Sequence, residues 1–163
     1  IDSRSAGSEL VLLVKKICEL IESGTDFETV VEKAELYSRH THVVFALSSF
    51  NNLVKNGRMS KIVGFVANKL GFWGIGIGSE QGTIEIKQKI RGSKKALDAI
   101  IEDMKERGYN CGKVVISHCR NAEFAESVKS AIQSVWDKAE VKIVHARGLC
   151  SYYAEKGGLI IGF

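Results

Sequence analysis

Apolar residues at the start of the chain recur at intervals of three and four, which is the spacing of one face of a helix. The range 8–23 follows this pattern, with Ser8 in the position of an N-cap. A second helix is expected directly afterwards, where Thr25 and Glu28 have the spacing of a capping box. Because so short a link makes two helices pack side by side, the pattern predicts a helical hairpin over residues 8–40.

After this hairpin, short apolar runs alternate with amphipathic segments. The runs are predicted strands at 42–47, 72–78, 83–90, 113–117, 141–144 and 159–163. Helices are predicted between several of them, including 61–70 after a Ser60 cap and 122–136 after an Asn121 cap. Such alternation favours crossover connections and a largely parallel or mixed sheet. The predicted fold class is therefore α/β, a mixed sheet covered by helices, with residues 41–163 as the core of a single domain over 1–163.

The predicted strand Phe72–Gly78 has the sequence FWGIGIG, which places glycine on one face and bulky side chains on the other. Glycine weakens a strand, so glycine at alternate positions indicates that something approaches the backbone closely on that face. Gly74 and Gly76 are the central positions of this face. A ligand that lies against them and a closely packed helix are both compatible with the pattern.

Two arginines flank this strand, and each stands beside a glycine at the start of a predicted helix. Arg58 follows Gly57, and its guanidinium can meet an anion together with free N–H groups of the next helix. Arg91 precedes a helix whose first turn contains Lys94 and Lys95, which favours a negatively charged partner. The alternatives are an Arg58 that binds carbonyls at a helix end and an Arg91 in a solvated basic face.

Polar residues follow the predicted strand 113–117, at the strand end where α/β proteins place ligand contacts. His118 is either a ligand residue or a packed, hydrogen-bonded side chain, and with Cys119 or Ser117 it would suit a small α/β hydrolase or transferase. No G-x-S-x-G elbow supports that enzyme. Tyr153 lies before Gly157 and Gly158, where its hydroxyl either reaches a ligand or fills the edge of the core.

Composition narrows the function classes. The 163 residues are 45% apolar and 26% charged, which predicts a globular domain rather than disorder. The net charge of +4 is too small and too dispersed to predict nucleic-acid binding, and no apolar run is long enough for membrane insertion. The four cysteines form no C-x-x-C pair, so neither a metal site nor a disulfide framework is predicted. We expect a cytoplasmic protein with free thiols and no cofactor.

Several motifs in order resemble one family. SSFNNLVKNGRMSK is followed by IRGSKKAL, then by VVISHC and by a glycine pair before an apolar strand. This series resembles the DegV family of bacterial fatty-acid-binding proteins. The initial IDSRSAGSE is similar to the Asp-Ser segment that leads from the N-terminal domain of that family into the rest of the fold. The resemblance implies that the chain is the C-terminal domain of a two-domain fold, with residues 1–7 as the end of the connection.

The resemblance also implies a function. A long-chain fatty acid would lie in an apolar tunnel, with Gly74 and Gly76 as a candidate wall, and its carboxylate would be presented to a partner fatty acid kinase. This chain would then be a binding protein, not an enzyme. Arg58 and Arg91 match the arginines of the family's GR and RG motifs, and His118 matches its strand-end histidine.

Two departures affect the expected site. The family's H-x-G-P-G motif near the C-terminus is replaced by YYAEKGG, in which Tyr153 substitutes for the histidine. The Ser and Thr groups that hold the carboxylate belong to the N-terminal domain of the family, which this sequence does not contain. Half of the head-group site is therefore expected here, and the surface exposed by the missing half is expected to favour self-association.

Overall fold

The computed structural model describes residues 1–59 and 72–163, so the predicted helix 61–70 and its Ser60 cap lie outside the described residues. The helices are α1 (Ser8–Glu22), α2 (Phe27–Ser38), α3 (Asn51–Lys55), α5 (Ser93–Glu106), α6 (Ala122–Val135) and α7 (Gly148–Ala154). The strands are β1 (Val43–Leu47), β2 (Phe72–Gly78), β3 (Ile84–Arg91), β4 (Lys113–His118), β5 (Glu140–His145) and β6 (Leu159–Gly162). The predicted strands and hairpin are confirmed, with ends that shift by one or two residues.

The strands form one six-stranded sheet in the order β3-β2-β1-β6-β4-β5. Among the described strands, β4 and β5 form the parallel pair, and the other neighbours are antiparallel. The mixed sheet is confirmed and the largely parallel alternative is wrong. The reason is that β2 and β3 form a hairpin and β6 enters between β1 and β4, whereas β4–α6–β5 is a crossover unit that keeps its strands parallel.

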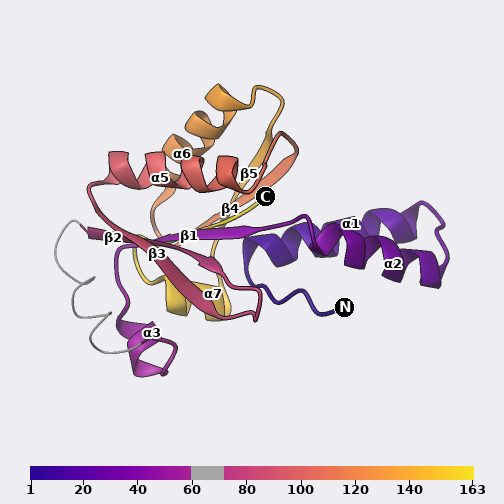
Figure 1. Cartoon of the computed structure of the whole chain (residues 1–163), viewed down its shortest axis with the longest axis horizontal. Coiled ribbons are helices and arrows are strands. Elements are labelled where there is room, and N and C mark those ends of the chain that lie inside the picture. Colours follow the sequence, from indigo (N-terminus) through magenta and orange to yellow (C-terminus); the bar gives the residue numbers. More distant parts are fainter. Residues whose placement is uncertain (60–71) are drawn as a thin grey trace.

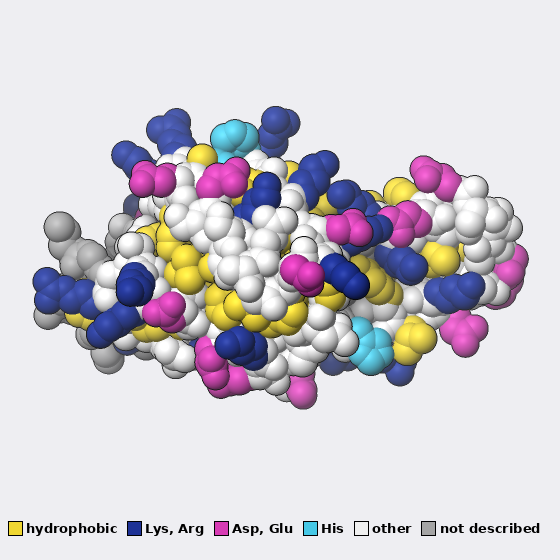
Figure 2. Space-filling view, turned by 90° about the horizontal axis from the view of Figure 1, so that it is seen from above, with side chains coloured by type: hydrophobic (Ala, Val, Ile, Leu, Met, Phe, Trp, Pro, Cys, Tyr) yellow, Lys and Arg dark blue, Asp and Glu magenta, His cyan; other side chains and the backbone are white. Residues whose placement is uncertain are grey.

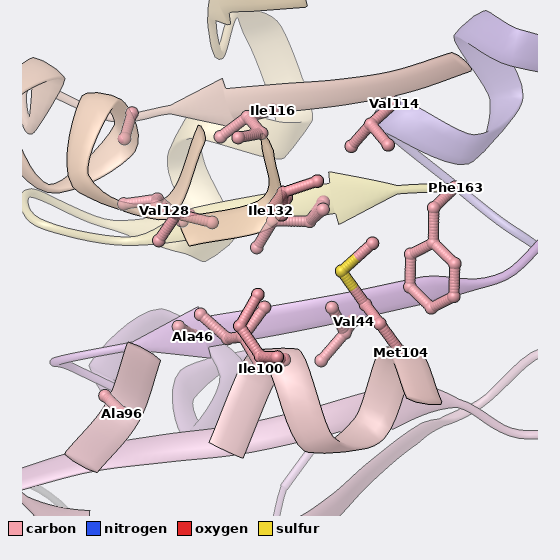
Figure 3. Close-up of a cluster of buried hydrophobic side chains, with 14 of the residues drawn as sticks. Val44, Ala46, Ala96, Ile100, Met104, Val114, Ile116, Val128, Ile132 and Phe163 are labelled. Carbon is pink, nitrogen blue, oxygen red and sulfur yellow. The ribbon is translucent and has the colours of Figure 1, made fainter. Parts of the chain in front are cut away.

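Helices cover the two faces of the sheet differently (Figure 1). Helices α5 and α6 lie over one face, and α3 and α7 lie on the other, while the α1–α2 hairpin projects from one end. The main hydrophobic core fills the space between the sheet and α5 and α6 (Figure 3). Its fully buried members include Val44, Ile100, Met104, Val114, Ile116 and Ile132.

The N-terminal end of α1 packs directly against β4 and β6. Gly162 permits this approach, because a Cβ on that residue would lie 2.4 Å from the backbone nitrogen of Glu9. Ser8 is buried at the contact and is not the N-cap, which is Gly7. Its hydroxyl instead donates to the carbonyl oxygen of Ile160 at 2.7 Å and lies 2.8 Å from the hydroxyl oxygen of Ser117.

Two further predicted caps differ from those of the structure. Asp26, not Thr25, caps α2, since its carboxylate accepts the backbone N–H of Thr29 at 3.0 Å. Asn121 stands in the N-cap position of α6 but makes no side-chain cap. Its amide donates to the carbonyl oxygen of Gly157 at 2.8 Å, because α7 and the loop after it pass over this end of the sheet.

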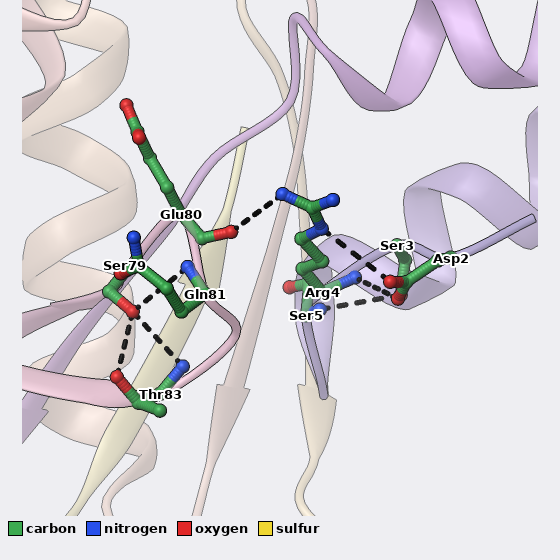
Figure 4. Close-up of polar contacts among 8 residues, drawn as sticks. All are labelled: Asp2, Ser3, Arg4, Ser5, Ser79, Glu80, Gln81 and Thr83. Atoms are coloured by element: carbon green, nitrogen blue, oxygen red, sulfur yellow. Dashed lines mark hydrogen bonds and ion pairs between the residues drawn. The ribbon is translucent and has the colours of Figure 1, made fainter.

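The N-terminal segment, residues 1–7, runs beside the β2–β3 turn (Figure 4). The guanidinium of Arg4 donates to the carbonyl oxygen of Glu80 at 3.0 Å and pairs with Asp2 at 3.5 Å. Within the turn, the hydroxyl of Ser79 accepts the backbone N–H of Thr83 at 3.1 Å. Residues 1–7 are therefore fixed to the same hairpin that carries the glycine face.

The outer surface mixes apolar and charged side chains. Leu10, Val14 and Ile21 of α1 are 40%, 50% and 60% exposed, so this helix presents apolar residues to solvent as well as to the core. Self-association through such a surface stays a prediction. Over the face of α5 and α6, basic and acidic side chains are interspersed (Figure 2). Among the described residues, no helix has the length and apolar character needed to cross a membrane.

Candidate functional site

A second apolar cluster lies on the sheet face opposite α5 and α6, beneath α3 and α7; we call it the α3–α7 cluster. Its buried members are Phe45, Leu47, Phe50, Leu53 and Ala154, and Met59, Ile86, Cys119, Tyr153 and Ile160 pack against it while partly exposed. The alternation of β1 explains this division, because Val44 and Ala46 point into the main core whereas Phe45 and Leu47 point the other way.

The glycine face of β2 belongs to this side of the sheet. A Cβ on Gly74 would lie 2.1 Å from the ring of Phe50, and one on Gly76 would lie 2.4 Å from the ring of Phe45. The close approach that the glycine pattern predicted is thus made by two aromatic rings of the chain itself and, at Gly76, also by the carbonyl oxygen of Glu85, 2.3 Å from the same Cβ position. A role for Gly74 and Gly76 in the wall of a ligand tunnel stays a prediction, and a ligand would meet these rings beside the glycines.

A β-bulge in the β2–β3 hairpin decides which side chains of β3 share this face. Ile86 pairs with Gly76 and Gln88 with Ile75, so Lys87 is the extra residue between them. As a result Ile86 and Lys89 point to the same side although they are three residues apart. They line a groove of about 630 Å³, which we call the β3 groove, together with Arg58, Met59, Ile84, Glu85, Lys87 and Gln88.

The local structure of α3 fixes the backbone at Arg58. Gly57 has φ 67°, and the N–H groups of Gly57 and Arg58 donate to the carbonyl oxygens of Val54 and Leu53 at 3.1 and 2.8 Å. These two bonds are those of a Schellman motif, so Gly57 ends the helix as predicted. The Arg58 side chain is exposed and makes no ion pair or hydrogen bond with the described residues, which leaves it available to an anion at the groove.

Arg91 is the last residue of β3 and pairs in register with Phe72. Lys89, two residues earlier, pairs with Gly74, so Arg91 points to the same face as the β3 groove. It is also exposed. The groove therefore has an apolar floor and a rim with the cations Arg58, Lys87 and Lys89 and the carboxylate of Glu85. Arg91 lies further along the same face of β3, beyond the residues that line the groove.

The strand-end residues form a separate group. His118 is 4% exposed, its ring packs at 4.5 Å against that of His145 on β5, and its Nδ1 accepts the backbone N–H of Asn121 at 3.1 Å. Because Nδ1 accepts, a neutral ring carries its proton on Nε2. Burial, and after it the neighbouring His145, lower the pKa of His118, so the neutral form is favoured.

The strand-end group does not form a nucleophile and base. The hydroxyl proton of Ser8 is donated to Ile160, so in the pair of hydroxyls Ser117 is the donor and Ser8 the acceptor. The Cys119 thiol points to the carbonyl oxygen of Ser151 at 3.8 Å. Within the described residues we find no pairing of His118 with either side chain, and no group of three His, Cys, Asp or Glu that could hold a metal ion.

Tyr153 packs at the edge of the α3–α7 cluster, and its ring meets that of Tyr152 edge-on at 5.2 Å. Glu155, two residues later, was missed by the sequence analysis. Its carboxylate accepts the Ser49 hydroxyl at 2.6 Å and the backbone N–H of Asn52 at 2.8 Å, both at the start of α3. The signal was the motif YYAEKGG, in which a glutamate stands where H-x-G-P-G has its first glycine.

The predicted site residues thus divide between the two faces. Arg58, Gly74, Gly76, Arg91 and Tyr153 belong to the face of the α3–α7 cluster. His118 lies two residues after Ile116 on β4, so both side chains point to the same face, and it pairs with Leu159. Ile116 and Leu159 belong to the main core, so His118 lies toward α6. The structure brings together the residues around the glycine strand and leaves the strand-end histidine apart from them.

Comparison with protein families decides the relationship of the chain. A family model described as "Uncharacterised protein, DegV family" matches residues 1–163. The chain belongs to the DegV family. Curated DegV relatives include a DegV domain-containing protein of Streptococcus pyogenes serotype M1, 44% identical over 163 residues, and one of Streptococcus gordonii, 39% identical. In both cases the match covers the whole of this DegV chain and 58% of the relative.

Solved structures share its fold. The fatty acid kinase (Fak) B3 protein of Streptococcus pneumoniae, loaded with linoleic acid, matches with a TM-score of 0.97 and 42% identity over all of this chain and 58% of that chain. A DegV family protein of Eubacterium eligens, loaded with heptadecanoic acid, matches with a TM-score of 0.96 and 36% identity over 99% of this chain and 59% of that chain. The DegV chain therefore spans somewhat more than half the length of these relatives.

Proposed function

We propose that this DegV chain contributes to the binding of a long-chain fatty acid. The observation that carries the proposal is the β3 groove, where Met59, Ile84 and Ile86 form an apolar floor beside exposed cations. A fatty acid has the same division, an apolar tail and an anionic head group. Support comes from the two structural neighbours that are loaded with linoleic and heptadecanoic acid and share the fold.

In the proposed arrangement, the tail lies along the partly exposed edge of the α3–α7 cluster, beside the rings that cover Gly74 and Gly76. The carboxylate lies toward Arg58 and Arg91, whose positive charges would be only partly screened by solvent. Tyr153 borders the same cluster, so in this arrangement its side chain would lie near the ligand. Direct contact of His118 with the ligand stays a prediction, since its ring lies toward the other face.

The proposal extends to the rest of the protein and to a partner. We expect this chain to act as the C-terminal domain of a two-domain DegV protein, with Ser and Thr groups of the other domain completing the carboxylate site. The Fak B3 neighbour is named for a fatty acid kinase, and the described residues offer no nucleophile–base pair. We therefore place the chemistry, phosphorylation of the carboxylate, in a partner kinase.

Binding of linoleate and of its neutral methyl ester to the protein at its full encoded length would test the proposal. Arg58→Ala and Arg91→Ala should each weaken linoleate binding about fivefold, since a partly exposed ion pair contributes on the order of 1 kcal/mol. Neither change should affect the methyl ester, which has no charge to lose. Isothermal titration with detergent-free, delipidated protein measures both affinities.

Lys138→Ala is the matched control, because it removes one exposed cation between α6 and β5, away from the groove. It should leave both affinities unchanged. Equal losses for linoleate and the ester in the arginine variants would show that the arginines act on the fold rather than on a carboxylate. An absence of linoleate binding by the unmodified protein would overturn the proposed function itself.

A further inference from the structure

Glu155 has a backbone conformation that side chains rarely adopt. It is the C-cap of α7, with φ 52° and ψ 176°, a region that is essentially restricted to glycine. Strain of this kind persists only where the surroundings determine the conformation, so the contacts of its side chain indicate what the strained residue does.

The carboxylate of Glu155 reaches from the end of α7 to the start of α3. It accepts the Ser49 hydroxyl at 2.6 Å, the backbone N–H of Asn52 at 2.8 Å and the side-chain amide of Asn51 at 3.5 Å. The N–H of Asn52 belongs to the first turn of α3, where helices leave donors without an internal partner. The N-cap of α3 is Phe50, which has no side-chain acceptor, so Glu155 supplies a cap from another helix.

The same two helices are joined further along α3. The side-chain amide of Asn52 donates to the carbonyl oxygen of Tyr152 at 2.8 Å, and that of Asn56 donates to the Tyr152 hydroxyl at 2.9 Å. All these bonds link α3 to the last residues of α7. A helix of five residues is too short to be stable alone, so its place depends on these contacts and on the burial of Phe50 and Leu53.

Helix α3 ends at Lys55, and Gly57, Arg58 and Met59 follow directly after its C-cap, Asn56. The position of α3 therefore sets where Arg58 and Met59 stand at the β3 groove. Arg91 is held differently, because it belongs to β3 and is fixed by the sheet ladder. We propose that Glu155 is a positioning residue that locks α3 to α7 and thereby places Arg58, but not Arg91, at the fatty acid site.

The placement of Arg58 for a ligand rests on the proposed function. The attachment of α3 to α7 by Glu155 does not depend on it. The test uses the protein at its full encoded length with Glu155→Gly, Glu155→Ala and Glu155→Gln. Glycine fits the backbone conformation but lacks the carboxylate. Alanine neither fits that conformation nor has a carboxylate, and glutamine keeps an oxygen acceptor for the N–H of Asn52. Lys156→Ala is the control, because it shortens the exposed neighbouring side chain.

Amide hydrogen exchange measures the lock without a ligand. Exchange in α3 should rise about tenfold or more in Glu155→Gly and Glu155→Ala. The reason is that the free energy contributed by a hydrogen bond to a charged group exceeds the free energy of a tenfold change in local opening. It should rise less in Glu155→Gln, which keeps an uncharged acceptor, and stay near that of the unmodified protein in Lys156→Ala. The melting temperature of Glu155→Gly should exceed that of Glu155→Ala, since glycine relieves the strain. Unchanged exchange in α3, or a uniform rise throughout the sheet, would overturn the inference.

Linoleate affinity then tests the positioning. Glu155→Gly should weaken binding, and its effect should largely disappear in an Arg58→Ala background, where no guanidinium remains to be placed, while it persists in an Arg91→Ala background. Equal effects in both backgrounds would contradict selective placement of Arg58. If the unmodified protein fails to bind linoleate while exchange in α3 responds as expected, the proposed function fails and the lock between the two helices stands.

Discussion

His118 ends β4 with its ring against that of His145 and its Nδ1 occupied by the backbone N–H of Asn121. Burial lowers its pKa in the folded protein relative to the unfolded chain. Between this lowered pKa and the ordinary histidine pKa the unfolded chain therefore binds more protons than the folded one, so stability falls as the pH decreases through that range. Above that pKa both states are neutral, and the residue has no effect on the pH dependence.

His118→Asn should make the stability less dependent on pH. The asparagine oxygen can replace Nδ1 as the acceptor for Asn121, but the variant cannot take up a proton. Urea unfolding at pH 5.5 and 7.5 should therefore show a smaller difference for the variant than for the unmodified protein. Burial also lowers the pKa of His42, so a second change, His42→Asn, should reduce the difference further. A difference as large as that of the unmodified protein would contradict the assigned protonation state.

Local signals in the sequence predicted residue roles only where the partner was also local. Gly57 was correctly predicted to end α3, because its left-handed conformation serves the helix that precedes it. Ser8 and Asn121 have typical N-cap identities, yet their side chains bind Ile160 and Gly157, which are distant in sequence. Glu155 was missed for the same reason, since its partners belong to α3.

At the scale of the element, β2 is the strand whose composition predicted the most. Its alternating glycines indicated a close approach on one face, which the rings of Phe45 and Phe50 make together with the carbonyl oxygen of Glu85. The sequence could not show whether the approaching group belonged to a ligand, a helix or a neighbouring strand. Phe50 comes from the N-cap of α3 and Phe45 from β1, so both a helix and a strand contribute to it.

Gly74→Ala should destabilise the protein by about 1 to 3 kcal/mol, the usual cost of overpacking a filled site, because its Cβ would overlap the Phe50 ring. In a Phe50→Ala background the same change should cost far less, since the ring is gone. Urea unfolding of the four proteins gives the coupling free energy. Gly78→Ala on the same strand provides a milder case for comparison, because its Cβ would lie 3.1 Å from a Val43 methyl group. Equal costs of Gly74→Ala in both backgrounds would show that the ring does not explain the glycine.

At the scale of the whole molecule, the α/β class and the helical hairpin followed from periodicity, which left a largely parallel and a mixed sheet both open. The strand order did not, because β6 inserts between β1 and β4, and such long-range pairings leave no local trace. Periodicity also did not predict how the site residues divide between the two faces of the sheet, because this depends on strand register and on the bulge at Lys87. The β3 groove became visible only once the register was known.

The central claim is that the DegV protein containing this chain holds a long-chain fatty acid. The most direct measurement is denaturing extraction of the protein, purified at its full encoded length without added lipid, followed by mass spectrometry of the extract. A fatty acid in a near-stoichiometric amount is the predicted result. An extract without fatty acid, from protein that also fails to take up linoleate, would contradict the account.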